Sequence, residues 1–268
     1  MVDIHSHILP LIDDGSCSLD ESLVMLKESI HSGVDAIVAT PHLLPGSYMA
    51  PTEHRDERLR ELREEVQRLQ LPIEIISGRE CYFSPEIYTY EKDLGKLTIN
   101  DNGKYLLIEA PIQEIPQYVD RMIFDIQVRG ITPIIAHAER YYDIIQNPNL
   151  THKYINVGCL IQVNVGSFLG RYGKRIQQTA EILLEHQMVH IVASDMHTQT
   201  SMFLGEGFET LSQIVGPEEA RCLVEDRPRA VIQNRSVEHP EPLVYHSKRS
   251  FKNLWRFFNK PFLSRDDS

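Results

Sequence analysis

The chain has 268 residues and a formal net charge of −11 at pH 7, so nucleic acid is not expected as a partner. No apolar run reaches the roughly 18 residues of a membrane span, and the first residues lack the segments of a secretion signal. The four cysteines form no CxxC pair, which favours unpaired thiols and a cytoplasmic location.

Seven short apolar runs predict buried strands, because parallel strands covered by helices on both faces read as near-continuous Ile, Val and Leu. Between them, a capping box from Ser18 to Glu21 opens a helix that ends near Gly33, and further helices are predicted over 53–70, 114–130 and 174–186. This alternation predicts an α/β fold with a parallel sheet. The predicted strands are residues 2–7, 36–42, 73–80, 105–111, 133–137, 160–165 and 189–195.

One domain is predicted over residues 1–240, followed by a basic tail over 241–268. Residues 246–262 contain five lysines and arginines and no acid, and Phe251, Trp255 and Phe258 recur at helical spacing. The pattern predicts a basic amphipathic helix that docks on the membrane surface or on a membrane-bound partner. The alternatives are a disordered terminus or aromatic side chains that pack back on the barrel.

Side chains that can bind a metal ion gather at the predicted ends of six of the seven strands, while the strand that ends at Asn164 offers no obvious ligand. The carboxyl ends of the strands in a barrel meet at one rim, so these side chains should converge. Imidazole and carboxylate ligands without thiolate suit Zn, Mn or Fe. The predicted metal ligands are His5, His7, Asp14, His42, Glu80, Glu109, His137, Asp195 and His197.

Any one of these side chains alone has an ordinary alternative, such as a buried histidine satisfied by the backbone or a salt bridge at the rim. Their joint placement carries the prediction. The strand alternation would also point His5 and His7 the same way, and likewise Asp195 and His197. The remaining histidines, His190 among them, are interpreted as surface residues.

Three divalent cations would bring six positive charges against four carboxylates, leaving a net charge of about +2 that attracts a phosphate dianion. A metal-bridging hydroxide is then expected to attack phosphorus in line. Arg140 follows His137 by three residues, and its guanidinium could grip two phosphate oxygens, the alternative being a surface salt bridge with Glu139 or Asp143. Neither a thiol-phosphatase motif nor a phosphate-binding glycine loop is present.

Several segments resemble the PHP (polymerase and histidinol phosphatase) domain. Segments 3–15, 105–111 and 162–167 more narrowly resemble the bacterial manganese-dependent tyrosine phosphatases of capsule and exopolysaccharide operons, and the resemblance covers about residues 1–235. The PHP-like segments are His5-Ser-His7, Thr40-Pro-His42, Gly78-Arg-Glu80, Leu106-Leu-Ile-Glu109, His137-Ala-Glu-Arg140 and Ser194-Asp-Met-His197.

The resemblance implies a distorted (β/α)7 barrel that holds three divalent metal ions, manganese in the first instance, with iron, zinc or cobalt as alternatives. Arg140, Glu109 and Asp195 would act at the reacting centre. The implied ligands are His5, His7, Glu80 and Asp195 for the first ion, Glu80, Glu109 and His137 for the second, and Asp14, His42 and His197 for the third.

The implied substrate is phosphotyrosine on the tail of a membrane-associated kinase that controls polysaccharide synthesis. One departure stands out: Met202 occupies the position, seven residues after Asp195, where relatives carry a second phosphate-binding arginine. Arg171 or Arg175 would have to substitute. The alternatives are a small-molecule phosphatase of the histidinol-phosphate type and a non-catalytic metal-binding scaffold, and a homo-oligomer stays open.

Overall fold

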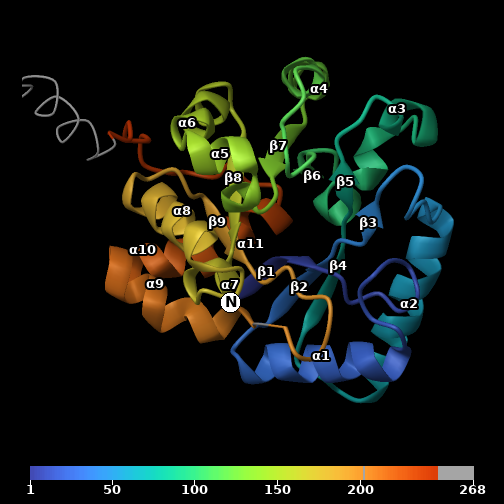
Figure 1. Cartoon of the computed structure of the whole chain (residues 1–268). Helices are drawn as coiled ribbons and strands as arrows, with labels where there is room; N and C mark the ends of the chain where they lie inside the picture. The colour runs from blue at the N-terminus through green and yellow to red at the C-terminus, as the bar shows by residue number, and fades with distance from the viewer. Residues whose placement is uncertain (202, 247–268) are drawn as a thin grey trace, which may run out of the picture.

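The computed structural model describes residues 1–201 and 203–246 and contains a curled parallel sheet surrounded by helices (Figure 1). The expected helix over 246–262 and the departure at Met202 lie outside the described residues, apart from His246. The strands are β1 (Val2–Ser6), β2 (Ala36–Ala39), β3 (His42–Leu43), β4 (Glu74–Ser77), β5 (Glu80–Tyr82), β6 (Tyr105–Glu109), β7 (Thr132–Ile135), β8 (Leu160–Asn164) and β9 (Ile191–Ala193).

The strands pair in parallel as β1-β2-β4 and as β3-β5-β6-β7-β8-β9. Only two residues separate β2 from β3, and only two separate β4 from β5. Each pair is therefore one strand with a short break, and the two sheets form one curled sheet. The sheet closes where the His7 N–H donates to Met196 O and the Asp195 N–H donates to His5 O, both at 2.9 Å. The described residues therefore form the predicted distorted (β/α)7 barrel.

The two breaks show that residues 36–42 and 73–80 are wrongly predicted as continuous strands. Pro41 has no N–H to donate to a ladder, and a Cβ at Gly78 would lie 2.8 Å from a methyl carbon of Val38. His42 and Glu80, expected as strand ends, instead begin β3 and β5 and pair with each other in register. The break thus places two candidate ligands side by side at the rim.

The helices predicted over 18–33, 53–70 and 174–186 are confirmed within a few residues, whereas the one over 114–130 begins only at Tyr118, after Pro116. Short helices escaped prediction because they are too brief to show a period. The α-helices are α1 (Leu19–His31), α2 (Thr52–Arg68), α3 (Ile87–Tyr90), α4 (Tyr118–Val128), α5 (Tyr142–Gln146), α6 (Asn149–Asn156), α7 (Val165–Phe168), α8 (Lys174–Glu185), α9 (Phe208–Val215), α10 (Pro217–Arg221) and α11 (Arg227–Ile232). The 3-10 turns η1 (Leu94–Leu97), η2 (Ile99–Asp101), η3 (Ala138–Arg140) and η4 (Leu204–Gly207), and the π-helical turn η5 (Cys222–Asp226), complete the set.

The capping box at the start of α1 forms with one shift. Ser18 Oγ accepts the Glu21 N–H at 3.1 Å, and Glu21 Oε2 accepts the N–H of Cys17, one residue before the cap, at 2.9 Å. One donor of the first turn and the donor just before the cap are satisfied, which fixes where the chain turns from the loop after β1 into the helix.

Strands β2, β6 and β8 divide their side chains between two apolar layers. On β8, Ile161 and Val163 join the layer that packs against the outer helices, while Leu160 belongs to the cluster inside the barrel. Val231 and Ile232 of α11 join that inner cluster, close to the N-terminal end of β6. The inner core therefore fills the end of the barrel away from the candidate ligands.

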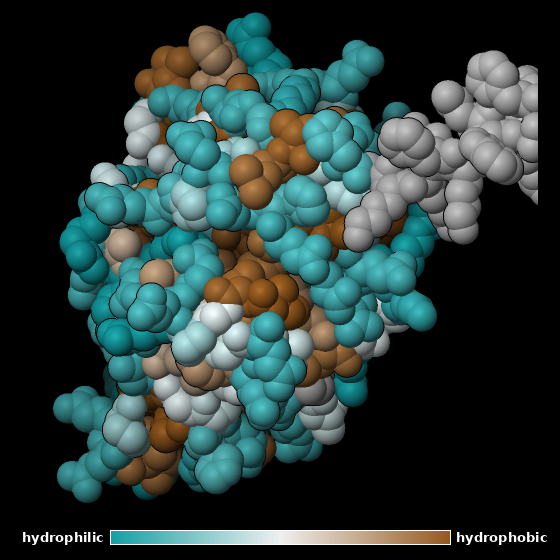
Figure 2. Space-filling model, turned by 90° about the vertical axis from the view of Figure 1, so that its left-hand side faces the viewer, coloured by the Kyte–Doolittle hydropathy of each residue, from teal (hydrophilic) through white to brown (hydrophobic). Residues whose placement is uncertain are grey.

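The surface around α8, α9 and α10 is mainly hydrophilic with small apolar areas (Figure 2). Across the part of the chain that the structure describes, no helix combines the length and hydrophobicity needed to cross a membrane. Beyond α11 the backbone lies against the barrel: the Leu243 N–H donates to His186 O and the Tyr245 N–H to Asn149 Oδ1, both at 2.8 Å. The boundary near residue 240 stays a prediction.

Candidate metal centre

The end of β1 presents two imidazole nitrogens to one point. His5 Nδ1 donates to Gln162 Oε1 at 3.1 Å, and His7 Nδ1 donates to Asp13 Oδ2 at 2.7 Å. Each ring therefore keeps an unprotonated Nε2 when neutral, and the two Nε2 atoms lie 3.3 Å apart in a fully buried position. Two facing lone pairs repel, so this pair requires a cation between or beside them.

Glu80 lies at the centre of the cluster. Its Oε2 is 3.2 Å from His5 Nε2, 3.3 Å from His7 Nε2 and 3.0 Å from His42 Nδ1. Its Oε1 is 2.9 Å from His137 Nε2. Glu80 is fully buried, and its Oε2 makes no hydrogen bond to any described residue. Such an oxygen suits a bridge between metal ions.

The outer part of the cluster reaches solvent. Asp14 Oδ1 lies 3.5 Å from both His42 Nε2 and His197 Nε2, and the Asp14 side chain is 46% exposed. Glu109 lies 3.2 Å from His42 Nδ1 and 3.7 Å from His137 Nε2. This side of the cluster is therefore the side open to solvent.

Ligand atoms within 4.8 Å of one another form three overlapping groups. The first group is the ligand set implied for the first ion. The second group differs from the set implied for the second ion, because it contains His42 in place of His137. The third group is the set implied for the third ion with His7 added. Because His7 Nδ1 is held by Asp13, His7 has one nitrogen for one ion. All nine predicted ligands therefore converge, and the donor set fits divalent ions. The groups are His5, His7, Glu80 and Asp195; His42, Glu80 and Glu109; and His7, Asp14, His42 and His197.

The electrostatics of the cluster favour added positive charge. Burial alone would lower the pKa of His42, yet Glu109 and Glu80 raise it to about 10. Burial alone would raise the pKa of Asp195, but His5 and His7 hold it well below its usual range. The pKa of Glu80 is likewise held low against burial, chiefly by His5 and His137. The carboxylates stay ionised and attract protons or metal ions.

Asp13 is a site residue that the sequence reasoning missed. Its carboxylate accepts from His7 Nδ1, from the His42 N–H at 2.8 Å and from the Gly15 N–H at 3.0 Å. Burial opposes ionisation of Asp13, but His7 and these N–H donors lower its pKa. Asp13 thus orients two candidate ligands, and its only sequence signal was its place beside Asp14.

Two candidate ligands sit on left-handed backbone, His137 at φ 34° and Asp195 at φ 54°. Strand β9 ends at Ala193, so Asp195 and His197 lie beyond the strand. A sharp turn directs both side chains to the centre, and the predicted alternation along a strand is wrong for this pair. Strained positions of this kind persist where surrounding contacts fix them, and they concentrate at functional sites.

Arg140 points at the cluster and pairs with neither neighbour named above. Its Nη1 donates to Asp195 Oδ2 at 3.2 Å, and its guanidinium lies 5.1 Å from the ring centre of Tyr172. Glu139 is buried and accepts from Ser167 Oγ, while Asp143 accepts the Ile115 N–H. The structure therefore shows no salt bridge from Arg140 to Glu139 or Asp143.

The two substitute arginines contact other groups. Arg171 Nη2 donates to Thr200 O at 3.3 Å, which brings it to the loop that precedes position 202. The Arg175 guanidinium lies 5.6 Å from the ring centre of Tyr142. Arg171 therefore lies beside the 198–201 loop, whereas Arg175 lies beside α5.

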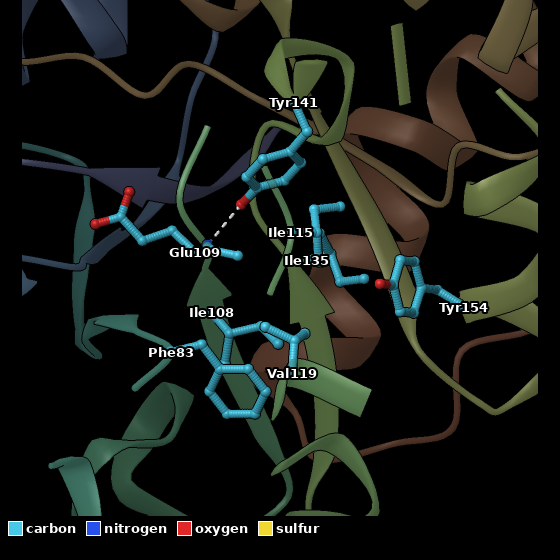
Figure 3. A pocket seen from close by; sticks show the side chains of 9 residues that line it. Phe83, Ile108, Glu109, Ile115, Val119, Ile135, Tyr141 and Tyr154 are labelled. Atoms are coloured by element: carbon cyan, nitrogen blue, oxygen red, sulfur yellow. Dashed lines mark hydrogen bonds between the residues drawn. The ribbon is translucent and has the colours of Figure 1, made fainter. Parts of the chain in front are cut away.

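A small apolar pocket lies behind the end of β6, lined by Phe83, Ile115, Tyr141 and Tyr154 among others (Figure 3). The Tyr141 hydroxyl accepts the Ala110 N–H at 2.9 Å, and the carboxylate of Glu109 points away from the pocket (Figure 3). The apolar wall keeps the Glu109 carboxylate on the side of the metal centre.

His190 contradicts its prediction as a surface residue. It is fully buried, and its Nδ1 accepts the Ile161 N–H at 3.1 Å. Burial, followed by His239 and Arg227, lowers the pKa of His190 well below its usual value. Its apolar neighbours along the predicted strand were the available signal.

A family model described as "Capsular polysaccharide synthesis, CpsB/CapC" matches residues 1–233. The tyrosine-protein phosphatase YwqE of Bacillus subtilis is 32% identical over 250 residues, covering 91% of this chain and 96% of the relative. The tyrosine-protein phosphatase CpsB of Streptococcus pneumoniae is 32% identical over 244 residues, covering 88% of this chain and 100% of the relative.

A solved structure from work on Bacillus subtilis YwqE and Streptococcus pneumoniae CpsB, described there as "unique metal-dependent tyrosine phosphatases", superposes with a TM-score of 0.85 at 29% identity. It covers 92% of this chain and 100% of that one. A β-aspartyl dipeptidase of Fervidobacterium islandicum shares the fold alone, with a TM-score of 0.50 at 13% identity over 94% of this chain and 78% of that one.

Proposed function

The chain belongs to the CpsB/CapC family of capsular polysaccharide synthesis, and from this membership we propose that it is a metal-dependent tyrosine-protein phosphatase. The observation that carries the proposal is the convergence of five imidazoles and four carboxylates, with the buried Glu80 at their centre. A scaffold that had lost catalysis would not need this complete ligand set, and burying it without metal ions would cost several kcal/mol per charge.

We assign three divalent ions to the centre, manganese first, with iron, zinc or cobalt as alternatives. Glu80 would be shared by the first and second ions, with His5, His7 and Asp195 on the buried side, and the other ligands would be those implied by the family. Bound ions at such a centre supply Lewis-acid activation of water and neutralise the charge of the phosphate.

Arg140 binds the phosphate in this proposal. Its guanidinium is 28% exposed and already donates to Asp195, so it can donate its remaining N–H groups to two phosphate oxygens beside the metal centre. Asp195 and Glu109 complete the reacting centre. We assign Arg171 to a second phosphate contact from the 198–201 loop, and Arg175 to the outer rim.

Phosphotyrosine suits the side of the cluster that is open to solvent. Tyr172 and Tyr142 are 36% and 47% exposed and each lies beside an arginine, Arg140 and Arg175. They offer ring faces on which an aryl group can stack. A phenolate leaving group, with a pKa near about 10, also needs less protonation than a sugar alkoxide.

We infer that the physiological substrate is a phosphotyrosine tail of a membrane-associated kinase that controls capsule or exopolysaccharide synthesis. The enzyme would act in the cytoplasm, and the basic amphipathic segment 246–262 of the tail would hold it at the inner face of the membrane.

The test compares phosphotyrosine peptides with histidinol phosphate as substrates of the manganese-loaded protein. The proposal expects kcat/KM to be at least about a hundred-fold higher on the peptides, which corresponds to about 2.7 kcal/mol of transition-state discrimination. Equal rates, or a preference for histidinol phosphate, would assign the centre to a small-molecule phosphatase. No turnover of either, with metal bound, would favour the scaffold.

A further inference from the structure

Two buried amide side chains on the inner face of β8 connect residues on three sides of the metal centre. Gln162 and Asn164 are both fully buried. Gln162 Oε1 accepts from His5 Nδ1 at 3.1 Å and from the His137 N–H at 2.9 Å. Asn164 Nδ2 donates to Asp195 Oδ2 at 2.7 Å, and Gln162 Nε2 donates to Asn164 Oδ1 at 2.8 Å.

One backbone group fixes the direction of every bond in this series. A backbone N–H can only donate, so the atom of Gln162 that faces His137 must be the oxygen. His5 Nδ1, which faces the same oxygen, must then carry its proton. The other end of the Gln162 amide must donate, so Asn164 presents its oxygen to Gln162 and its NH2 to Asp195.

This direction of hydrogen bonding leaves both His5 and Asp195 in the state in which each can bind a metal ion. His5 has its proton on Nδ1, which leaves the Nε2 lone pair facing Glu80 and Asp195 at 3.2 Å. Asp195 accepts through Oδ2, which keeps its Oδ1 free for the centre. The Asn164 backbone is held as well, because its N–H donates to Glu139 Oε1 at 3.0 Å.

We propose that Gln162 and Asn164 act as a directional amide relay, a pair of positioning residues that fixes His5 as an Nε2 ligand and Asp195 as an Oδ1 ligand. The inference rests on the proposed metal centre, and it extends that centre to the strand that offers no ligand of its own. Outer hydrogen-bond partners of metal ligands commonly change metal affinity by about 10- to 100-fold when removed.

The experiment measures Zn²⁺ binding to the full chain by calorimetry for the wild type, Gln162→Leu, Asn164→Leu and the double variant. Each single variant should weaken binding at the tightest site about 10- to 100-fold. Because the two amides form one series, the double variant should lose little more than the worse single variant. Val163→Ala, on the opposite face of the same strand, is the matched control and should bind Zn²⁺ normally.

Losses of less than threefold in both single variants would overturn the relay. So would fully additive losses, because independent packing damage adds whereas a coupled pair does not. Zn²⁺ affinity needs no substrate, so a failure of the tyrosine-phosphatase proposal leaves this measurement valid.

A measurement on the wild type keeps the inference testable if the leucine variants do not fold. In the Zn²⁺-loaded protein, nitrogen-15 NMR of the histidine rings should show His5 with a slowly exchanging proton on Nδ1 and metal on Nε2. Metal on Nδ1, or an Nδ1 proton that exchanges as fast as that of an exposed histidine, would contradict the relay.

Discussion

Arg140 is the residue at which the proposed phosphate site and the candidate metal centre meet. It contacts the candidate ligand Asp195 but carries a positive charge, so it can hold phosphate and not metal. Its orientation is fixed from two sides, by the Asp195 carboxylate and by the Tyr172 ring. A guanidinium held in place in this way loses little side-chain entropy when substrate binds.

Arg140→Ala should lower kcat/KM on an aryl phosphate about 10- to 100-fold, equivalent to about 1.5–3 kcal/mol of lost charged hydrogen bonds. Metal stoichiometry should stay unchanged. Arg140→Lys should recover only part of the loss, because an ammonium group lacks the planar fork. Steady-state kinetics with Arg121→Ala, an exposed arginine of α4, give the control. Unchanged kinetics in Arg140→Ala would remove the residue from the phosphate site.

His190 should make folding stability depend on pH. Its folded pKa is depressed, so below pH of about 6.5 the unfolded chain binds a proton that the folded protein excludes. The free energy of unfolding contributed by His190 is therefore complete above that pH and falls by up to about 1.4 kcal/mol per unit as the pH drops.

His190→Asn keeps an acceptor for the Ile161 N–H and removes this titration. Denaturant unfolding of the metal-free protein between pH 8 and 5.5 should show a smaller loss of stability in this variant than in the wild type. His31→Asn, at the exposed end of α1, should behave as the wild type does. Parallel curves for His190→Asn and the wild type would contradict the buried neutral imidazole.

The loop between β1 and α1 shows how one element positions several ligands. It carries Asp13 and Asp14, and it folds back so that the Ser16 N–H donates to His7 O at 3.0 Å. This approach is possible only at a glycine, since a Cβ at Gly15 would lie 2.1 Å from His7 O. The backbone must move if any side chain is added there.

Gly15→Ala should therefore displace Asp13 and Asp14 together and weaken metal binding by at least about tenfold, with a loss of stability of about 1–3 kcal/mol. Gly46→Ala is the control for metal affinity, because a Cβ there meets no atom of the described residues within 4 Å and the metal affinity should stay normal, although the left-handed φ of 84° at Gly46 also lowers stability. Calorimetric metal titration and thermal unfolding of both variants check this. Normal metal affinity in Gly15→Ala would contradict this tight approach of Gly15 to His7.

The barrel and the cluster of candidate ligands could be predicted from the sequence, but the way in which these side chains approach one another could not. Apolar runs show where strands are, and residue types show which ends carry ligands. The break between β2 and β3 depends on a neighbouring strand as well as on Pro41. For this reason His42 was predicted at the end of one strand, whereas it begins the next strand, β3. Gln162 and Asn164 read as polar interruptions of a strand, because their partners are distant in the sequence.

At the scale of the whole molecule, the closed sheet gathers ligands from residues 5 to 197 at one end of the barrel, while α11 fills the inner core near the other. Chain before residue 246 also packs on the barrel, with Tyr245 edge-on to His186 at a 5.3 Å ring separation. A truncation that removes the basic tail should therefore be made after His246, so that these contacts of the chain with the barrel are kept.

Truncation after His246 should abolish binding to anionic phosphatidylglycerol vesicles and leave soluble turnover unchanged. Each basic residue near such a surface contributes about 1 kcal/mol, and the aromatic residues add apolar burial. Sedimentation with vesicles at low and high salt measures this, with neutral phosphatidylcholine vesicles as the control. A full-length chain that fails to bind anionic vesicles at low salt would rule out the lipid contact.

The central claim is that catalysis by this protein depends on metal ions held around Glu80. The most direct measurement titrates Mn²⁺ into chelator-treated protein and follows bound ions per chain and phosphotyrosine turnover in parallel, for the wild type and for Glu80→Gln. The wild type should bind three ions and gain activity as they bind, while Glu80→Gln, which keeps the shape but loses the charge, should lose the first and second ions and with them the activity. Full turnover by the metal-free wild type, or normal metal binding and turnover by Glu80→Gln, would contradict the account.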